Sequence, residues 1–370
     1  MSESQDNHGR VLAALSQIQD TDFKQDIVSL RWVQNIHTEA SHIACDLVLP
    51  VPLFPGKMKL KAEAEAALRA LPGVSSSTVT LRGEISAQPR MDTRVLHGVK
   101  NIVAVGSGKG GVGKSTTAVN LAVALSSWGA RVGLVDGDIY GPTLPIMLGA
   151  REHDLMQNER GIIPVVAHGI RFMSMGLLSK GSAPLIWRGP MAHKAVQESL
   201  LHVDWGELDY LLVDMPPGTG DVHLTLVQTV PVTGAVIVST PQDVGLIISM
   251  KTFKLFEQTH VPLLGIIENM SYHICPHCDT REYIFGHGSV AEEAKKHGIP
   301  FLGEIALDRQ IREHSDQGLP IVISHPDSPA AQDYLKIAAQ IAVQVALRNG
   351  AAQPIQIIEE PEAPSQTFSV

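Results

Sequence analysis

The chain has 370 residues, 44% of them hydrophobic, so it is long enough to form two domains with sizeable cores. Its formal net charge of -9 gives no electrostatic reason to expect nucleic-acid binding, which requires a cationic face. Three cysteines are too few for a disulfide framework in a chain of this length, so a close pair suggests metal or redox chemistry.

Both ends of the chain are polar. The first residues are acidic instead of basic and then apolar, and no apolar run approaches the length of a membrane span. We therefore expect a cytoplasmic protein that does not attach to a membrane. Disorder is expected over residues 1–8, and over residues 351–370 because an acidic, proline-containing tail cannot bury enough apolar surface.

Residues 9–86 predict a small α+β domain. An alternating run places Ile43, Cys45, Leu47 and Leu49 on one side of a strand, and a helical pattern follows from about Leu60 to Leu71. Because Cys45 lies on the apolar side of its strand, we expect it to be a buried structural thiol. Residues 87–99 have little apolar periodicity and predict an exposed linker.

Residues 100–350 show a different pattern, in which short runs rich in β-forming residues alternate with segments of helical length. Runs that are apolar on both faces indicate a mainly parallel sheet covered by helices on both faces, which is an α/β fold. The predicted strands are Asn101–Val105, Arg131–Val135, Tyr210–Val213, Gly234–Thr240 and Leu263–Ile267.

A Gly-x-x-x-x-Gly-Lys-Ser pattern lies between the first of these strands and a predicted helix, which is the setting of a P-loop NTPase. Its glycines let backbone N–H groups surround phosphate oxygens, while Lys114 neutralises the outer phosphates and Ser115 ligates Mg²⁺. The pattern thus predicts a site for a nucleotide and Mg²⁺. The predicted binding residues are Gly108, Lys109, Gly110, Gly111, Val112, Gly113, Lys114, Ser115 and Thr116.

Carboxylates follow the next two predicted strands. Asp136 and Asp138 point the same way at a strand's carboxyl end, where ligands of open α/β sheets bind. One of the two could position the attacking water and the other could support Mg²⁺, with a solvated turn as the alternative, and we include Asp138 among the candidate catalytic residues. Asp214 ends an apolar run before a Pro-Pro-Gly-Thr-Gly loop and resembles a Walker B aspartate, so it is expected to be an outer-sphere Mg²⁺ partner.

The sequence favours ATP over GTP, because the Asn-Lys-x-Asp element that specifies guanine in related folds does not follow the switch loop. Asn269, at the end of the last predicted strand, is a candidate contact for adenine. An asparagine that only caps the strand is an equally good interpretation.

Cys275-Pro276-His277-Cys278 lies in a short non-periodic stretch after that strand. Two thiolates separated by two residues can bind one metal centre, because a tight turn directs both sulfurs the same way. Zinc would accept the two cysteines with His273 or His277, or four sulfurs across a dimer. A thioredoxin-like redox pair is disfavoured because the motif does not open a helix.

Together these motifs resemble those of a known family. Lys109 gives the P-loop a second lysine, which is the mark of deviant Walker A ATPases such as MinD and the nitrogenase iron protein. With Asp136-x-Asp138, Asp214-x-Pro-Pro-Gly-Thr-Gly-Asp and the segment from Glu268 to Cys278, the chain looks like the Mrp/ApbC iron-sulfur cluster carriers. The first domain resembles the PaaD-like assembly-factor domain that often precedes these ATPases.

The resemblance implies a homodimer in which Lys109 reaches the partner's nucleotide, so that Lys109, Lys114, Asp138 and Asp214 form the catalytic set. It also implies an iron-sulfur cluster on Cys275 and Cys278. A 4Fe-4S cluster normally requires four thiolates, so two chains would share one cluster. Cluster-assembly proteins would be the donors, apo iron-sulfur proteins the recipients, and slow ATP hydrolysis would gate transfer.

Two other functional classes remain open on the sequence. One is a MinD-like positioning ATPase with a structural zinc site, although its usual basic amphipathic terminal helix is missing from the acidic tail. The other is a nucleotide-gated electron donor like the nitrogenase iron protein, which holds its cluster with well-separated cysteines.

Overall fold

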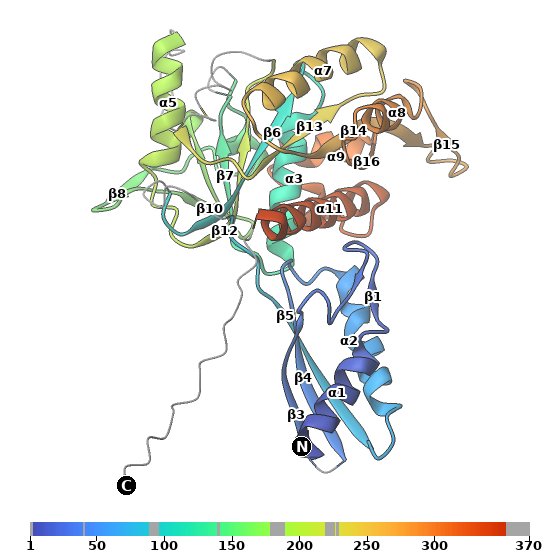
Figure 1. Cartoon of the computed structure of the whole chain (residues 1–370). Helices are drawn as coiled ribbons and strands as arrows, with labels where there is room; N and C mark the ends of the chain where they lie inside the picture. Colours follow the sequence, from blue (N-terminus) through green and yellow to red (C-terminus); the bar gives the residue numbers. More distant parts are fainter. Residues whose placement is uncertain are drawn as a thin grey trace.

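The computed structural model describes residues 3–39, 41–88, 96–138, 141–177, 189–218, 226 and 229–352. It contains a small α+β unit followed by a larger α/β unit (Figure 1). The predicted fold class is confirmed in both parts. No helix among the described residues is long and apolar enough to span a lipid bilayer.

The small unit has a three-stranded sheet in the order β3-β4-β5. Strands β3 and β4 are antiparallel, whereas β4 and β5 are parallel and are joined by helix α2. Helix α2 starts with proline, whose fixed φ suits the first helical position. The elements are α1 (Glu3–Leu15), β1 (Gln19–Asp20), β2 (Gln25–Asp26), β3 (Val33–Glu39), β4 (His42–Leu49), α2 (Pro55–Arg69) and β5 (Ser76–Gly83).

The helices at the two ends of the chain extend further than the sequence indicated. Helix α1 begins at Glu3, within residues 1–8 that were expected to be disordered, and the last helix continues to Ala352. In α1, the buried residues Val11 and Leu15 anchor the last turns, and helix propagation then adds one hydrogen bond for each further residue. Residues 353–370 lie outside the described part of the chain, as do residues 89–95 of the expected linker.

The large unit is built on one sheet with the strand order β10-β11-β7-β12-β6-β13-β14-β15, and β16 pairs with β14. Seven of these strands form only parallel pairs with one another, namely β11, β7, β12, β6, β13, β14 and β16. Its first elements are β6 (Val99–Ser107), α3 (Lys114–Ser127), β7 (Val132–Asp136), α4 (Leu144–Met147), β8 (Met156–Asn158), β9 (Gly161–Ile163), β10 (Val165–Ala167), β11 (Ile170–Ser174), the 3-10 helix η1 (Met175–Leu177) and α5 (Gly189–Leu201).

The remaining elements complete the sheet and its helical layers. They are β12 (Leu208–Asp214), β13 (Gly234–Ser239), α7 (Asp243–Gln258), β14 (Leu263–Ile274), β15 (Arg281–Glu282), α8 (Ser289–Lys296), β16 (Phe301–Ala306), α9 (Arg309–Asp316), α10 (Ile321–Ser324) and α11 (Pro329–Ala352).

Two apolar cores lie on opposite faces of this sheet. On β6, Val103 and Val105 belong to the core shared with α3 and α11, whereas Ile102 and Ala104 belong to the core shared with α5, α7 and α8. Fully burying a valine or isoleucine side chain, relative to leaving it exposed, stabilises the fold by roughly 1.5–3 kcal/mol. The double coverage explains why the strands are apolar throughout instead of alternating.

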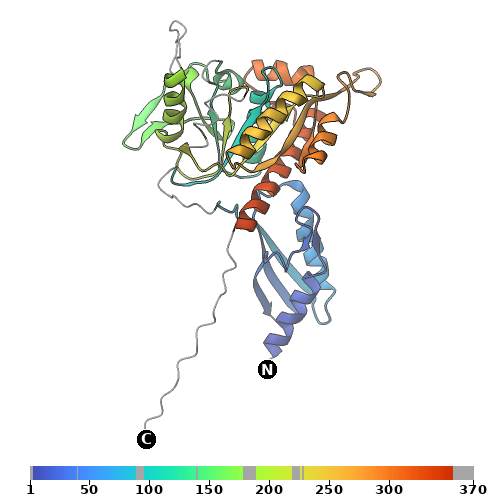
Figure 2. The ribbon, with the colours of Figure 1, turned by 45° about the horizontal axis from the view of Figure 1, so that its top comes forward.

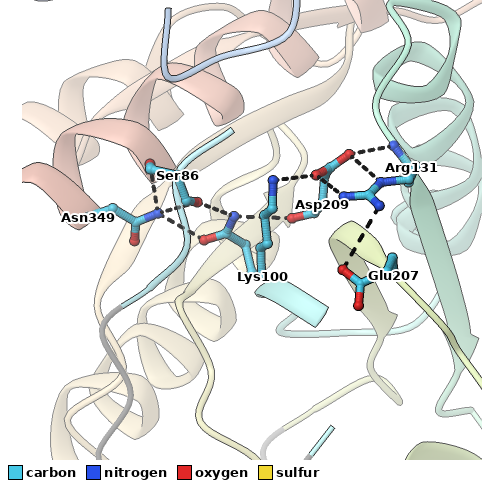
Figure 3. A network of polar contacts seen from close by, with 7 residues as sticks. Ser86, Lys100, Arg131, Glu207, Asp209 and Asn349 are labelled. Atoms are coloured by element: carbon cyan, nitrogen blue, oxygen red, sulfur yellow. Dashed lines mark hydrogen bonds and ion pairs between the residues drawn. The ribbon is translucent and has the colours of Figure 1, made fainter. Parts of the chain in front are cut away.

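The small unit lies at the amino ends of the parallel strands, beside the end of α11 (Figures 1 and 2). The carbonyl of Ser86 accepts hydrogen bonds from the side-chain amides of Asn101 (2.8 Å) and Asn349 (2.9 Å). Figure 3 shows this contact beside a second one, in which Asp209 accepts from Lys100 and Arg131. Ser86, in the segment that connects the two units, is therefore hydrogen-bonded to both β6 and α11.

The Asn349→Ala variant tests how much the hydrogen bonds of Asn349 stabilise the protein. Asn349 is fully buried, and its amide also donates to Asn101 Oδ1 at 2.9 Å, so removing it leaves buried polar groups without partners. We expect the free energy of unfolding to fall by about 1–3 kcal/mol in denaturant titrations. Arg348→Ala, at the preceding exposed position, is the control, and equal stability of the two variants would contradict the assignment.

Candidate functional site

The P-loop connects the carboxyl end of β6 to the start of α3. Gly111 and Gly113 have φ of 78° and 81°, a left-handed conformation that glycine adopts without strain. A side chain at Gly113 would also collide with the amide nitrogen of Asn269. No described side chain caps the start of α3, so its first N–H groups are available to bind phosphate oxygens.

Lys114 and Asp214 form a buried ion pair at the base of this loop. The Lys114 ammonium donates to Asp214 Oδ1 and lies 3.1 Å from Ser115 Oγ. Burial raises the pKa of Asp214, and the charge of Lys114 opposes this shift. Asp214 Oδ2 is buried without a hydrogen-bond partner among the described residues. A water held by Mg²⁺ at Ser115 would satisfy that oxygen, so these residues fit the expected Mg²⁺ site.

The carboxylates of Asp136 and Asp138 have different environments. Asp136 pairs in register with Asp214 on the neighbouring strand and accepts a hydrogen bond from Ser174 Oγ at 2.8 Å. Burial and the nearby charge of Asp214 raise the pKa of Asp136 to about 7. Asp138 is only half-buried, so it is the more accessible of the two. The switch residues 219–221 and positions 139–140 lie outside the described part of the chain.

Lys109 is not a member of the Lys114–Asp214 ion pair. Its ammonium lies 3.4 Å from Gln242 Oε1, immediately before α7, and its carbonyl accepts a hydrogen bond from Ser107 Oγ. Its side chain is partly exposed. Lys109 and Lys114 therefore have separate partners within one chain.

A cavity of about 420 Å³ adjoins the P-loop on the side of β14. Asn269 lines it and donates a hydrogen bond to the carbonyl of Val112 at 2.7 Å, so this side chain also holds the P-loop in place. The far wall is formed by Leu307, Ile311 and Arg312, which no sequence motif indicates. Their position after the last parallel strand, at the sheet edge where ligands bind, is the signal that could have identified them.

The cysteine pair lies in the hairpin between β14 and β15. His273 and Ile274 pair with Glu282 and Arg281, and the Cys275 amide donates to the Thr280 carbonyl at 3.0 Å. Figures 1 and 2 show this hairpin projecting from the body of the unit. Cys275 is half-buried and Cys278 is exposed, so both thiols are accessible.

The Cys278 thiol has hydrogen-bond partners within the hairpin. Its sulfur lies 3.2 Å from Thr280 Oγ1, and the hydrogen bonds with Thr280 and with the Cys275 thiol lower the pKa of Cys278. A lower pKa favours the thiolate, which is the metal-binding form. Cys45 differs, because burial raises its pKa to about 11, in agreement with the expected buried thiol.

Among the described residues, the two thiols do not belong to any group of three or more potential ligand atoms that lie within 4.8 Å of one another. The one group of three or more potential ligands within 4.8 Å in the described ranges is Glu268, His287 and Glu304, which includes no cysteine. Glu268 accepts from Ser271 and from the amide of Val290, and Glu304 is paired with Arg281. Within the described ranges, the two cysteines and a histidine are therefore not preassembled at that distance.

Comparisons with known proteins identify the family. Residues 98–342 match the ParA family, described as NUBPL iron-transfer P-loop NTPase, and residues 9–81 match the iron-sulfur cluster assembly protein family. The chain is 44% identical to an iron-sulfur cluster carrier protein from Deinococcus radiodurans, over 94% of this chain and 98% of that protein. It is 45% identical to the iron-sulfur cluster transfer protein NUBPL of Dictyostelium discoideum, over 82% of this chain and 94% of that protein.

Solved structures agree with this assignment. A nucleotide-binding protein from Archaeoglobus fulgidus, in complex with ADP, is 41% identical, with a TM-score of 0.54 over 60% of this chain and 87% of that chain. The cell division ATPase MinD from Pyrococcus furiosus is 25% identical, with a TM-score of 0.50 over 65% of this chain and 98% of that chain. The chain belongs to the NUBPL iron-transfer family of P-loop NTPases.

Proposed function

We propose that this protein is an ATP-dependent iron-sulfur cluster carrier that binds a cluster between two copies and transfers it to apoproteins. The observation that carries the proposal is the course of β14, which holds Asn269 against the P-loop and ends in the hairpin with Cys275 and Cys278. The names of its relatives from Deinococcus radiodurans and Dictyostelium discoideum support the same role.

Different residues around the P-loop would bind the phosphates, adenine and Mg²⁺ and orient the attacking water. The free N–H groups of α3 and the Lys114 ammonium bind the phosphates, and Asn269 lines the cavity proposed for adenine. Mg²⁺, when bound, would neutralise charge on the outer phosphates. Ser115 would hold it directly, and Asp214 would hold it through water. Asp138 would orient the water that attacks the γ-phosphorus as the bond to ADP breaks.

Two copies are needed for both parts of the proposal. Each chain offers two accessible thiols, whereas a 4Fe-4S cluster takes four, so a two-fold axis would complete the ligand set. Lys109 is not occupied by the buried ion pair of its own chain and is available to reach the partner's nucleotide. Slow hydrolysis would then gate cluster binding and release, with assembly proteins as donors and apo iron-sulfur proteins as recipients.

Strand β14 connects Asn269, which contacts the P-loop, to the cysteines proposed to bind the cluster. Asn269 contacts Val112 in the P-loop, and the next residue, Met270, has a left-handed φ of 57°, which is uncommon for a side chain of this kind. Cys275 follows Ile274, the last residue of β14. A shift of the P-loop on ATP binding would therefore move Asn269 and, through a short stretch of strand, the hairpin.

Lys109→Ala separates the roles of the two P-loop lysines. We expect this variant to bind ATP with nearly unchanged affinity but to lose hydrolysis by roughly 10²-fold or more, because one charge acting in the transition state is removed. Lys114→Ala should lose both ATP binding and hydrolysis, since Lys114 would contact the phosphates of the nucleotide bound to its own chain. Isothermal titration and phosphate release are the measurements. Equal losses of binding and turnover in Lys109→Ala would place its action within its own subunit.

Substitution of the hairpin cysteines tests the cluster site. Cys275→Ala and Cys278→Ala should abolish iron-sulfur absorbance after anaerobic reconstitution while ATP binding survives, because the thiols lie outside the P-loop. Cys45→Ala is the matched control and should load normally. Iron analysis of the parental protein should return about four irons for two chains. One tightly held zinc with no iron would instead favour a structural zinc site.

A further inference from the structure

The far wall of the cavity beside the P-loop is hydrogen-bonded to the end of β14. Leu307 lines this cavity. Its amide donates to the Tyr272 carbonyl at 2.6 Å, and its carbonyl lies 3.1 Å from His273 Nδ1. Because a carbonyl oxygen can only accept, Nδ1 carries the hydrogen in this contact. The cavity wall is therefore bonded to the third and second residues before Cys275.

The ladder between β14 and β16 is irregular in front of this contact. Glu268 pairs with β16, the next paired residue of β14 is Tyr272, and the register shifts between them. Asn269, which contacts the P-loop, lies in this interval together with Met270, whose φ is 57°. A stretch without ladder bonds can absorb a displacement of Asn269. The bonds to Leu307 supply an attachment closer to the thiols.

Tyr272, on one side of the contact, is held from several directions. Its hydroxyl donates to Asp333 Oδ2 at 2.5 Å, and the same oxygen accepts from the Ala306 amide at 3.2 Å. The Arg281 guanidinium lies 3.4 Å from the Tyr272 ring centroid. Tyr272 is buried, whereas His273 is half-buried. The side chain of His273 thus makes the bond to the cavity wall that is nearest in sequence to the thiols.

We propose that His273 is a positioning residue that couples the base cavity to the cysteine hairpin through its hydrogen bond to Leu307. The inference rests on the proposed function, in which nucleotide binding gates the cluster. A base that fills the cavity packs against Leu307 and fixes its carbonyl. The His273 ring is then held as well, so Cys275 and Cys278, two and five residues further along, adopt fewer conformations. The role requires a donor at Nδ1 and no metal on the ring.

Alkylation of the iron-free protein by iodoacetamide tests the inference. We use saturating MgADP because it fills the site without being hydrolysed. In the parental protein it should slow alkylation of Cys275 and Cys278 by at least about fivefold, the lower end of typical coupling between sites. Mass spectrometry of the peptides gives the rates, and isothermal titration gives the saturating concentration for each variant. A parental rate that ignores MgADP would overturn the inference.

Three substitutions of His273 differ in where they place a donor. Asparagine puts its amide nitrogen near the position of Nδ1, glutamine puts it near that of Nε2, and leucine has none. We expect His273→Asn to keep the parental response to MgADP, and His273→Gln and His273→Leu to lose it. His277→Leu, at an exposed position of the same hairpin, is the control and should respond as the parental protein does.

A parental response in His273→Gln and His273→Leu would overturn the inference, and so would its loss in His273→Asn. If His273→Leu does not fold, the two polar variants decide. After anaerobic reconstitution, His273→Asn and His273→Leu should hold as much iron as the parental protein; loss of iron from both would make the ring a cluster ligand and overturn the positioning role. A parental protein that takes up no iron contradicts the proposed function alone, because alkylation is measured without iron.

Discussion

The hydrogen bond from Asn269 to the carbonyl of Val112 is the constraint that joins the two halves of the proposed mechanism. It requires a glycine at position 113, because a side chain there would collide with the Asn269 amide. The same strand, β14, continues to Ile274, directly before the first hairpin cysteine. The nucleotide site and the thiols are thus attached to one element, and coupling between them needs no long chain of intermediates.

The small unit lies at the opposite edge of the sheet from the P-loop. Strand β6 runs between these edges, and its nine residues span roughly 26 Å at 3.3 Å per residue. Two cavities, of about 490 and 620 Å³, lie between the units and are larger than the one beside the P-loop. The Ser86 contacts and the packing of Phe54 against Trp128, at the end of α3, keep the units together.

The sequence predicted those parts of the site that depend on neighbouring residues. The P-loop, Asp214 and the cysteine pair were found because each needs particular residue types at fixed spacing next to a strand, and the structure places all of them at strand ends. The wall formed by Ile311 and Arg312 was missed, because it arises only when β16 pairs with β14 and brings distant segments together. The Arg281 contacts depend in the same way on tertiary packing that no local pattern encodes.

The rate at which the reconstituted protein loses its cluster to a ferrous-iron chelator, with and without saturating MgATP, tests the central claim most directly. The account predicts that MgATP changes this rate in the parental protein. It also predicts that the change disappears in Asn269→Ala, which has lost the contact between β14 and the P-loop. The account would be contradicted by a parental rate that ignores MgATP, or by an Asn269→Ala variant that binds ATP and responds as the parental protein does.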